Sequence, residues 1–218
     1  MQFKNRNEAG ELLANALDAF RSTPAVVCPL PRGGVALGVV VARRLDLPLD
    51  LVIPRKIGHP SNPEYAVCAV GETGELVCNE AERARLDPQW LADAVDHERA
   101  EARRRRILYL GKRQPLSLQA KTAILVDDGI ATGLTLRAAI RDVRGRNADR
   151  VVVAVPVGPR DSLRVIAAEA DQVIVLDAPE YFRGAVSAYY SSFPQLSDED
   201  VLDLLSTLPA TSSDVVTG

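Results

Sequence analysis

The most informative stretch of the chain is ILVDDGIATGLT, residues 124–135. It begins in an apolar run that predicts a buried strand, and it continues with the paired carboxylates Asp127 and Asp128. A turn rich in glycine and threonine follows, and a helix is expected from about Leu134. Unpaired N–H groups and the helix dipole attract an anion at such a helix start, and glycines let it approach the backbone closely. We therefore predict a phosphate site here, beside two carboxylates that suit sugar hydroxyls and a nearby Mg²⁺.

A simpler interpretation of the same residues is a capped turn between a strand and a helix. In that case Asp127 or Asp128 only satisfies backbone donors at the start of the helix. A lone Asp-Asp-Gly would favour this simpler interpretation. The complete stretch, with its threonines and second glycine, favours the phosphate site.

The segments around this turn repeat the order strand, helix, strand. Strands are expected at residues 25–30, 50–54, 122–126, 150–155 and 172–176, and helices at 35–45, 134–143 and 161–170. This alternation predicts an α/β fold of three layers, with a mostly parallel open sheet flanked by helices. Such sheets bind ligands outside the carboxyl ends of their strands, which are the loops after Leu30, Pro54, Val126 and Val155.

The remaining segments predict smaller elements around this sheet. Short strands at 66–70 and 75–78 flank Gly-Glu-Thr-Gly and indicate a small hairpin. Residues 79–109 read as a charged helix that ends in four arginines, and 111–119 as a polar loop. Amphipathic helices are expected at 8–20 and after the acidic cap at 197–200. We expect one domain over residues 1–207, with a charged helical flap region at about 79–120, and a disordered tail at 208–218.

Composition limits the class of protein. The chain has 218 residues and a formal charge of 26 − 29 = −3, which gives no overall electrostatic signal for nucleic-acid binding. Cys28, Cys68 and Cys78 form no CxxC pair, and their odd number favours buried apolar thiols in a reducing compartment. No apolar run is long enough to span a membrane, and the first helix lacks the apolar core of a signal peptide. We expect a cytoplasmic protein.

Basic residues follow the first two predicted strands. Pro31-Arg32-Gly33-Gly34 suits a diphosphate, because glycines expose backbone donors and a guanidinium binds two oxygens at once. A glycine turn between a strand and a helix is common, however, so this motif gains weight only together with the loop after Val126. Arg55 and Lys56 either reach the same diphosphate or are two solvated surface cations.

Residues 126–135, with the apolar strand before them, resemble the phosphoribosyl-pyrophosphate (PRPP) signature of type I phosphoribosyltransferases. That signature consists of four apolar residues, two acids, and a loop that ends in Thr-Gly-x-Thr. The Pro-Arg-Gly-Gly motif stands where these enzymes carry a pyrophosphate loop. The stretches 54–58, 62–66 and 69–70, with Arg106, Tyr109 and Gly111, are similar to a bacterial subgroup of phosphoribosyltransferase-like proteins, so the likeness covers about residues 25–200.

The resemblance implies a role for each matching residue. Asp127 and Asp128 would hold the ribose 2- and 3-hydroxyls, directly or through Mg²⁺. The 5-phosphate would lie on Gly129, Ala131, Thr132, Gly133, Leu134 (backbone only) and Thr135. The pyrophosphate would lie on Arg32, Gly33, Gly34, Arg55 and Lys56. Asp127, Asp128, Arg32 and Lys56 would be the catalytic group, and residues 103–119 are the candidate flap that excludes water.

Two positions depart from the family pattern. Hypoxanthine-guanine enzymes have an aspartate where this chain has Ala131, and usually a lysine where it has Leu134. These departures weaken a hypoxanthine-guanine assignment without establishing adenine. For the acceptor we expect Tyr181 or Phe182 to stack on a base, with core or interface packing as the alternative, and His59 is a weaker candidate for ligand contact.

The resulting hypothesis is a Mg²⁺-dependent enzyme that transfers ribose 5-phosphate from PRPP to a nitrogen nucleophile, in the first place a nucleobase, and releases pyrophosphate. The alternative is a PRPP-sensing regulatory protein with little transferase activity. The acidic balance argues against nucleic acid, whereas Arg103–Arg106 argues mildly for it. A different phosphate-handling α/β enzyme ranks last, and the resemblance implies a possible homodimer.

Overall fold

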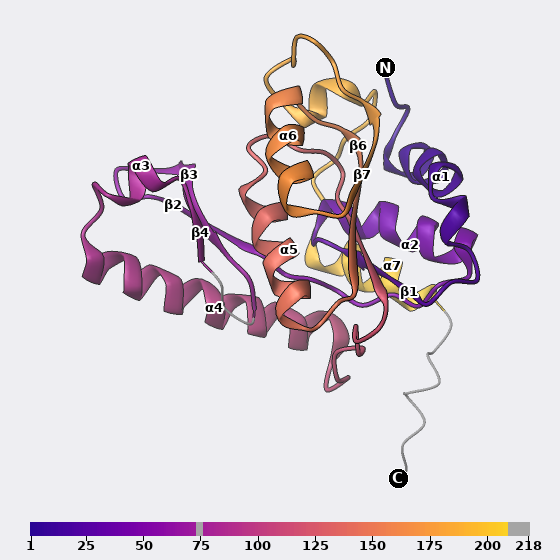
Figure 1. Cartoon of the computed structure of the whole chain (residues 1–218), viewed down its shortest axis with the longest axis horizontal. Helices are drawn as coiled ribbons and strands as arrows, with labels where there is room; N and C mark the ends of the chain where they lie inside the picture. Colours follow the sequence, from indigo (N-terminus) through magenta and orange to yellow (C-terminus); the bar gives the residue numbers. More distant parts are fainter. Residues whose placement is uncertain (73–75, 209–218) are drawn as a thin grey trace.

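A parallel sheet forms the centre of the computed structural model, which describes residues 1–72 and 76–208. Its strand order is β1-β5-β6-β7, and every neighbouring pair is parallel (Figure 1). The strands are β1 (Ala25–Pro29), β5 (Thr122–Val126), β6 (Arg150–Val157) and β7 (Gln172–Asp177). The predicted mostly parallel open sheet is confirmed.

Helices cover both faces of this sheet because its strands are apolar on both sides. Alternate strand residues point to opposite faces, so Val27 and Ile124 join one core cluster while Val26 and Leu125 join another. The first cluster packs against α1 (Arg6–Ala16) and α2 (Gly33–Leu45), and α7 (Asp198–Ser206) lies on α2. The second packs against α5 (Leu134–Gly145) and α6 (Arg160–Glu169). Two short 3₁₀ helices are η1 (Asp18–Phe20) and η2 (Val186–Tyr189).

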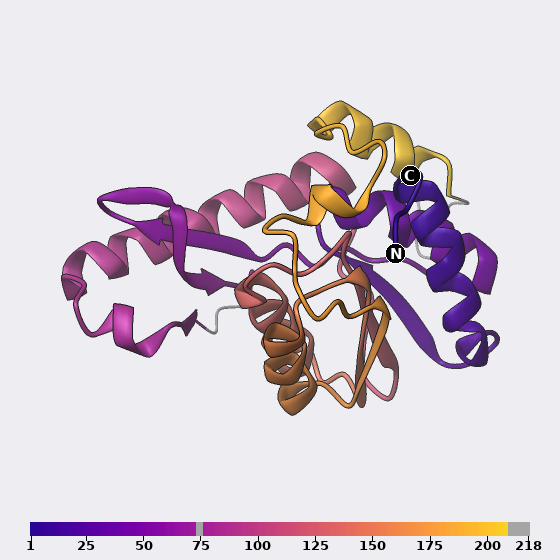
Figure 2. The same cartoon turned by 90° about the horizontal axis from the view of Figure 1, so that it is seen from above.

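A second, antiparallel sheet projects from the side of this body (Figures 1 and 2). Its elements are β2 (Arg55–His59), β3 (Asn62–Val70), β4 (Leu76–Cys78), α3 (Glu80–Arg83) and the long α4 (Pro88–Leu110). We call residues 55–72 and 76–99 the arm. One face of its sheet packs on α4 through Ile57 and Leu91, and the other packs on α5 through Ala69 and Val77. The predicted hairpin is therefore confirmed, and it is docked on α5. This helix follows the glycine- and threonine-containing turn at residues 129–133, which we call the phosphate turn after its predicted role.

Two predicted elements are wrong in detail. The expected strand at 50–54 runs beside β1, where the N–H groups of Asp50 and Val52 donate to the carbonyl oxygens of Val27 and Pro29, but the isolated bridge to Val27 is made by Leu49. The next strand, β2, begins at Arg55 and belongs to the second sheet. The expected single helix at 79–109 is divided into α3 and α4, because Asp87 caps a new helix whose first residue is Pro88. The expected tail falls almost wholly on residues 209–218, which lie outside the described residues.

The cysteine prediction is also wrong in part. All three thiol residues are buried as expected, but Cys68 and Cys78 form a disulfide and only Cys28 is free. The reason is the strand register, which places Cys68 directly opposite Cys78 in the antiparallel β3–β4 pair. Sequence spacing gives no sign of this pairing, and the odd count therefore carries no information about the compartment.

Residues 103–119 are anchored to the body. Arg106 Nη2 donates to Asp50 Oδ1 at 2.7 Å, and Arg146 Nη2 donates to Asp50 Oδ2 at 2.6 Å, with Asp50 fully buried. The backbone N–H of Leu116 and the side chain of Arg113 add bonds to the same segment, residues 49–51. A hinged flap would lack such buried ties, so we look to other elements for the cover of the site.

No helix in the described part of the chain is long and apolar enough to cross a membrane.

Candidate functional site

The two glycine-containing loops at the carboxyl ends of β1 and β5 press against each other. A Cβ placed on Gly33 would lie 1.9 Å from Asp128 Oδ2, and one on Gly34 would lie 2.4 Å from the carbonyl oxygen of Val126. Only glycine fits at either position. The predicted pyrophosphate loop and the predicted ribose loop are thus one continuous surface, as expected for neighbouring strands of a parallel sheet.

A cavity of about 210 Å³ opens at the turn after β5. It is lined by Lys56, Ala66, Asp127, Gly129, Ile130, Ala131, Thr132, Gly133, Leu134, Thr135, Leu136 and Val186. Sequence reasoning named most of these residues and missed Ala66, Ile130, Leu136 and Val186. Three separate parts of the chain meet there: the arm supplies Lys56, β5 and α5 supply the turn, and η2 supplies Val186.

The turn exposes the start of α5 to the cavity. Gly133 adopts a left-handed conformation with φ of 79°, which favours glycine, and it has no side chain to cap the first N–H groups of the helix. Ser162 Oγ donates to the carbonyl oxygen of Ala131 at 2.8 Å and holds the turn from α6. Thr132 is exposed, whereas Leu134 is buried against Ala69 and Val77 of the arm. Leu134 is thus a packing residue that joins the turn to the arm.

The two acids differ in their surroundings. Burial and the adjacent charge of Asp128 raise the pKa of Asp127 well above its ordinary value. Burial also raises the pKa of Asp128, but the Arg6 guanidinium opposes that shift. Asp127 Oδ1 accepts the backbone N–H of Asp128 at 2.9 Å. The pair therefore carries two carboxylates against one guanidinium, an excess of negative charge that suits a cation.

Arg6 and Tyr190 belong to this site although no sequence motif marks them. Arg6 Nε donates to Asp128 Oδ2 at 2.8 Å, and Tyr190 Oη donates to the carbonyl oxygen of Asp128 at 2.7 Å. Burial raises the pKa of the Tyr190 phenol, so it remains a donor. Arg6 lies 122 residues from Asp128 and Tyr190 lies 62 residues away, and local sequence patterns cannot reveal such contacts.

The predicted pyrophosphate cations occupy three different positions. Arg32 lies beside the glycine loop and pairs with Asp198 at 3.5 Å. Successive residues of a strand point to opposite faces, so Arg55 faces α4 and pairs with Glu98 at 2.8 Å, while Lys56 faces the cavity. Lys56 is half exposed and pairs with Glu64 at 3.3 Å. The structure thus brings Lys56 to the phosphate turn and turns Arg55 away from it.

The predicted acceptor residues do not line the cavity. Tyr181 is 83% exposed, and Phe182 stacks on Tyr189 with ring centroids 5.4 Å apart. The packing alternative therefore describes Phe182. His59 Nδ1 accepts the backbone N–H of Ser61 at 3.1 Å within its own turn.

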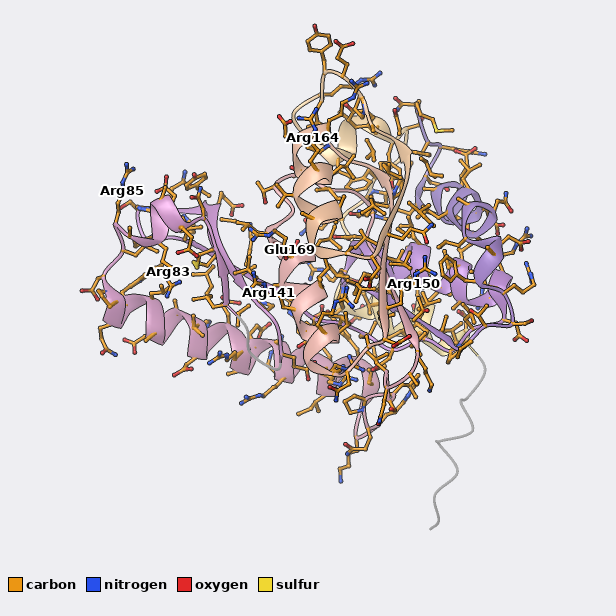
Figure 3. All side chains as sticks on the ribbon, in the orientation of Figure 1. Arg83, Arg85, Arg141, Arg150, Arg164 and Glu169 are labelled. Atoms are coloured by element: carbon orange, nitrogen blue, oxygen red, sulfur yellow. A yellow bond between two sulfur atoms is a disulfide. The ribbon has the colours of Figure 1, made fainter. Side chains whose placement is uncertain are left out.

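Three residues of the arginine run at 103–106 pair with acids of the same chain, while Arg103 and Arg104 are exposed. Arg104 and Arg105 both pair with Glu101, and Arg106 is buried against Asp50. Other arginines lie on separate elements: Figure 3 shows Arg85 on the arm and Arg164 on α6, with Arg141 and Glu169 between them on facing helices.

Comparisons with known proteins agree with this geometry. A family model described as a phosphoribosyl transferase domain matches residues 3–188. Proteins from two strains of Mycobacterium tuberculosis, provisionally named phosphoribosyl transferase, are 40% identical over 206 residues, which is 93% of this chain and 46% of theirs. The chain thus spans about half the length of these curated relatives. The crystal structure of TT1426 from Thermus thermophilus is 41% identical and covers 94% of this chain and 98% of that one, with a TM-score of 0.79.

Proposed function

Because the chain belongs to the phosphoribosyl transferase family, we propose that it uses PRPP with Mg²⁺ to transfer ribose 5-phosphate to a nitrogen nucleophile, releasing pyrophosphate. One observation supports this most strongly. The glycine loop after β1, the acid pair after β5 and the uncapped start of α5 meet at one edge of the sheet, and Lys56 lines the same cavity as Asp127 and the turn. Each of these features supplies donors, acceptors or charge that suit one part of PRPP: the phosphate, the ribose or the pyrophosphate.

PRPP has three parts, and we assign each part to its own subsite. We assign the 5-phosphate to the turn from Ala131 to Thr135, where the N–H groups of α5 and the threonine hydroxyls are donors. We assign the ribose hydroxyls to Asp127 and Asp128. We assign the pyrophosphate to the glycine loop, with Arg32 beside it, and to Lys56, the cation that the arm presents.

The acid pair fits Mg²⁺ held jointly with the substrate. In residues 1–72 and 76–208, no three His, Cys, Asp or Glu side chains form a metal cage. Mg²⁺ in proteins keeps several waters and is commonly held by one or two carboxylates plus substrate phosphates, which matches Asp127 and Asp128. When bound, the ion would supply positive charge for the pyrophosphate that leaves.

The chain's own groups would then favour cleavage of the bond between ribose and pyrophosphate. Negative charge grows on the departing pyrophosphate, and Arg32, Lys56 and the loop N–H groups stabilise it without moving far. The arm and the η2 segment border the cavity through Ala66 and Val186, so we assign them the exclusion of water. This replaces the predicted flap at 103–119, which is tied to buried Asp50.

We assign the acceptor to the Val186 side of the cavity and keep a nucleobase as the first candidate. A second candidate, a PRPP-sensing regulator, gains support from one observation: Tyr181 and Phe182 supply no aromatic face to the cavity. Such a protein would bind PRPP and turn over slowly. Arg105 and Arg106 pair with acids of the chain, which leaves only Arg103 and Arg104 of this run exposed and weakens the case for nucleic acid as its partner.

Calorimetric titration of PRPP, with and without Mg²⁺, tests the proposal directly. We expect Mg²⁺-dependent binding that is lost in the Asp127→Asn/Asp128→Asn double variant and kept in the surface control Asp203→Asn. Pyrophosphate release with a panel of nucleobases then separates the transferase from the regulator. Absence of PRPP binding in the unmodified chain would refute both candidates.

We also propose a cytoplasmic location, where a sugar phosphate of this kind is supplied, and a homodimer, in keeping with the resemblance. Disulfides are rare in the cytoplasm, so the thiol content of protein taken rapidly from cells tests the location. Static light scattering of the purified chain tests the dimer.

A further inference from the structure

Arg6 makes three contacts that together fix its guanidinium. Nε donates to Asp128 Oδ2 at 2.8 Å, and Nη1 donates to the carbonyl oxygen of Pro194 at 2.7 Å. The Phe193 ring stacks on the guanidinium, with its centroid 3.6 Å from the central carbon. The side chain is only 10% exposed. A guanidinium held on two edges and one face has little freedom to turn.

The segments that hold Arg6 are the N-terminal residues and the stretch between η2 and α7. Phe3 N–H donates to the carbonyl oxygen of Tyr189, and Ser191 N–H donates to that of Phe3, both at 2.8 Å. We call residues 3–6 and 189–194 the terminal layer. It reaches Asp128 twice, through the Arg6 side chain and through the Tyr190 hydroxyl on the backbone carbonyl.

Of these contacts, only the Arg6 bond uses a carboxylate oxygen of Asp128, and it uses Oδ2, which also lies against Gly33. Among the described residues, no hydrogen bond reaches Asp128 Oδ1. A carboxylate fixed in this way presents a single acceptor in a set direction, which is what recognition of a hydroxyl requires.

We propose that Arg6 is a positioning residue: it orients Asp128 so that Oδ1 accepts a ribose hydroxyl, and it leaves Asp127 as the acid that faces the metal. The inference rests on the proposed use of PRPP. It assigns different tasks to two adjacent acids. A merely structural Arg6 would hold the terminal layer on the body and would have no effect on which sugar the site prefers.

The test measures sugar preference, which a structural role does not change. Binding of ribose 5-phosphate and of its 2-deoxy and 3-deoxy analogues is measured for the unmodified chain, Arg6→Gln and Arg6→Lys. A hydrogen bond to a charged group corresponds to roughly a 10–100-fold preference for ribose 5-phosphate over the analogue that lacks the hydroxyl. We expect this preference to fall to about 3-fold or less in Arg6→Gln and to an intermediate value in Arg6→Lys. Lysine keeps the positive charge but lacks the planar guanidinium, whose donors are fixed in direction.

Arg183→Gln is the matched control. Arg183 bonds to Gln2 and to the carbonyl oxygen of Ala188 in the same region, but it does not touch Asp128. We expect it to lower the melting temperature and to keep the full sugar preference. If Arg6→Gln is too unstable to assay, the fall in preference in Arg6→Lys decides.

Two results would overturn the inference, and they can be told apart. If the unmodified chain prefers ribose 5-phosphate and both Arg6 variants keep that preference, Arg6 is structural only. If the unmodified chain binds none of the sugars, the proposed use of PRPP fails first, and the role of Arg6 fails with it.

Discussion

At the residue scale, the acids Asp127 and Asp128 are adjacent in sequence and differ in how their charge is compensated. Burial raises the pKa of both, but the Arg6 guanidinium lies 2.8 Å from Asp128 and opposes the shift there, whereas at Asp127 the charge of Asp128 adds to it. Ionised Asp127 therefore costs folding free energy. We interpret this as stability given up for a cation-binding site.

Asp127→Asn should raise the melting temperature in the absence of ligand, because it removes a buried charge and keeps the Oδ1 acceptor. A gain of about 1 kcal/mol corresponds to roughly 2–4 °C for a chain of this size. A carboxyl whose folded-state pKa is raised destabilises the fold increasingly as the pH rises from its unfolded-state pKa to its folded-state pKa, so the gain should shrink as the pH falls. Thermal unfolding between pH 5 and 8 measures it.

Asp128→Asn is the paired comparison and should lower the melting temperature, because it leaves buried Arg6 without its carboxylate. Equal shifts for the two variants would show that the acids are equivalent in the empty protein, contrary to the geometry.

The subsites can be separated by two further substitutions. Thr132→Val removes a hydroxyl from the phosphate turn. It should lower the affinity for ribose 5-phosphate by about tenfold and change the affinity for pyrophosphate little. Arg32→Ala should have the reverse effect. Calorimetry with the two ligands alone measures both, and the opposite pattern would mean that the subsites are exchanged.

Cys28 should be unreactive in the folded chain, because burial raises the pKa of its thiol to about 12. A colourimetric thiol assay at pH 8 without reductant should detect no thiol in native protein. After unfolding it should detect one per chain, since Cys68 and Cys78 are paired. Three thiols after unfolding would contradict the disulfide.

The acid pair, the glycine loop and the phosphate turn could be predicted because each is a short continuous pattern at a strand end. Arg6, Tyr190 and Val186 could not, because each reaches the site only through the tertiary fold. Arg55 and Lys56 looked equivalent in sequence and are separated only by the alternation of β2.

At the scale of elements, α4 connects the arm to the body through Arg106. This residue is buried and bonds to Asp50, Leu51 and Glu72, and Arg146 shares the Asp50 carboxylate. Residues 49–54 run beside β1 and include Asp50. Their apolar pattern is the reason that the sequence predicted a strand here. Backbone bonds from Asp50 to Val27 and from Val52 to Pro29 join the segment to β1, and the ion pairs of Asp50 add to them.

Arg106→Met should therefore destabilise the fold by about 3 kcal/mol, because it leaves a buried carboxylate partly unpaired. The control Arg104→Met removes only an exposed pair with Glu101 and should leave the free energy of unfolding nearly unchanged. Urea unfolding of both variants measures the difference. Equal costs would show that the Asp50 cluster is not a buried anchor.

At the scale of the whole molecule, the arm and the body are joined at the site. The arm contacts α5 through Ala69 and Val77, which pack on Leu134, and Leu134 directly follows the phosphate turn. The same sheet presents Lys56 and Ala66 to the cavity. Its position on α5 therefore sets the position of a proposed pyrophosphate cation.

The Cys68–Cys78 bond links β3 to β4 inside the arm core, and its reduction should loosen the arm alone. The two cysteines are 10 positions apart in sequence, so the loop is short and the expected cost is at most about 3 kcal/mol. Hydrogen exchange should rise in β2, β3 and β4 and stay unchanged in β5 and β6. PRPP affinity should fall less than tenfold, because the arm supplies only Lys56 and Ala66 to the lining of the cavity.

The Cys68→Ser/Cys78→Ser variant is the control. It should show the same hydrogen exchange and PRPP affinity as the reduced protein, and adding reductant should change neither. A uniform rise in exchange that includes β5 would show that arm and body unfold as one cooperative unit, and the phosphate turn would then depend on the disulfide as well.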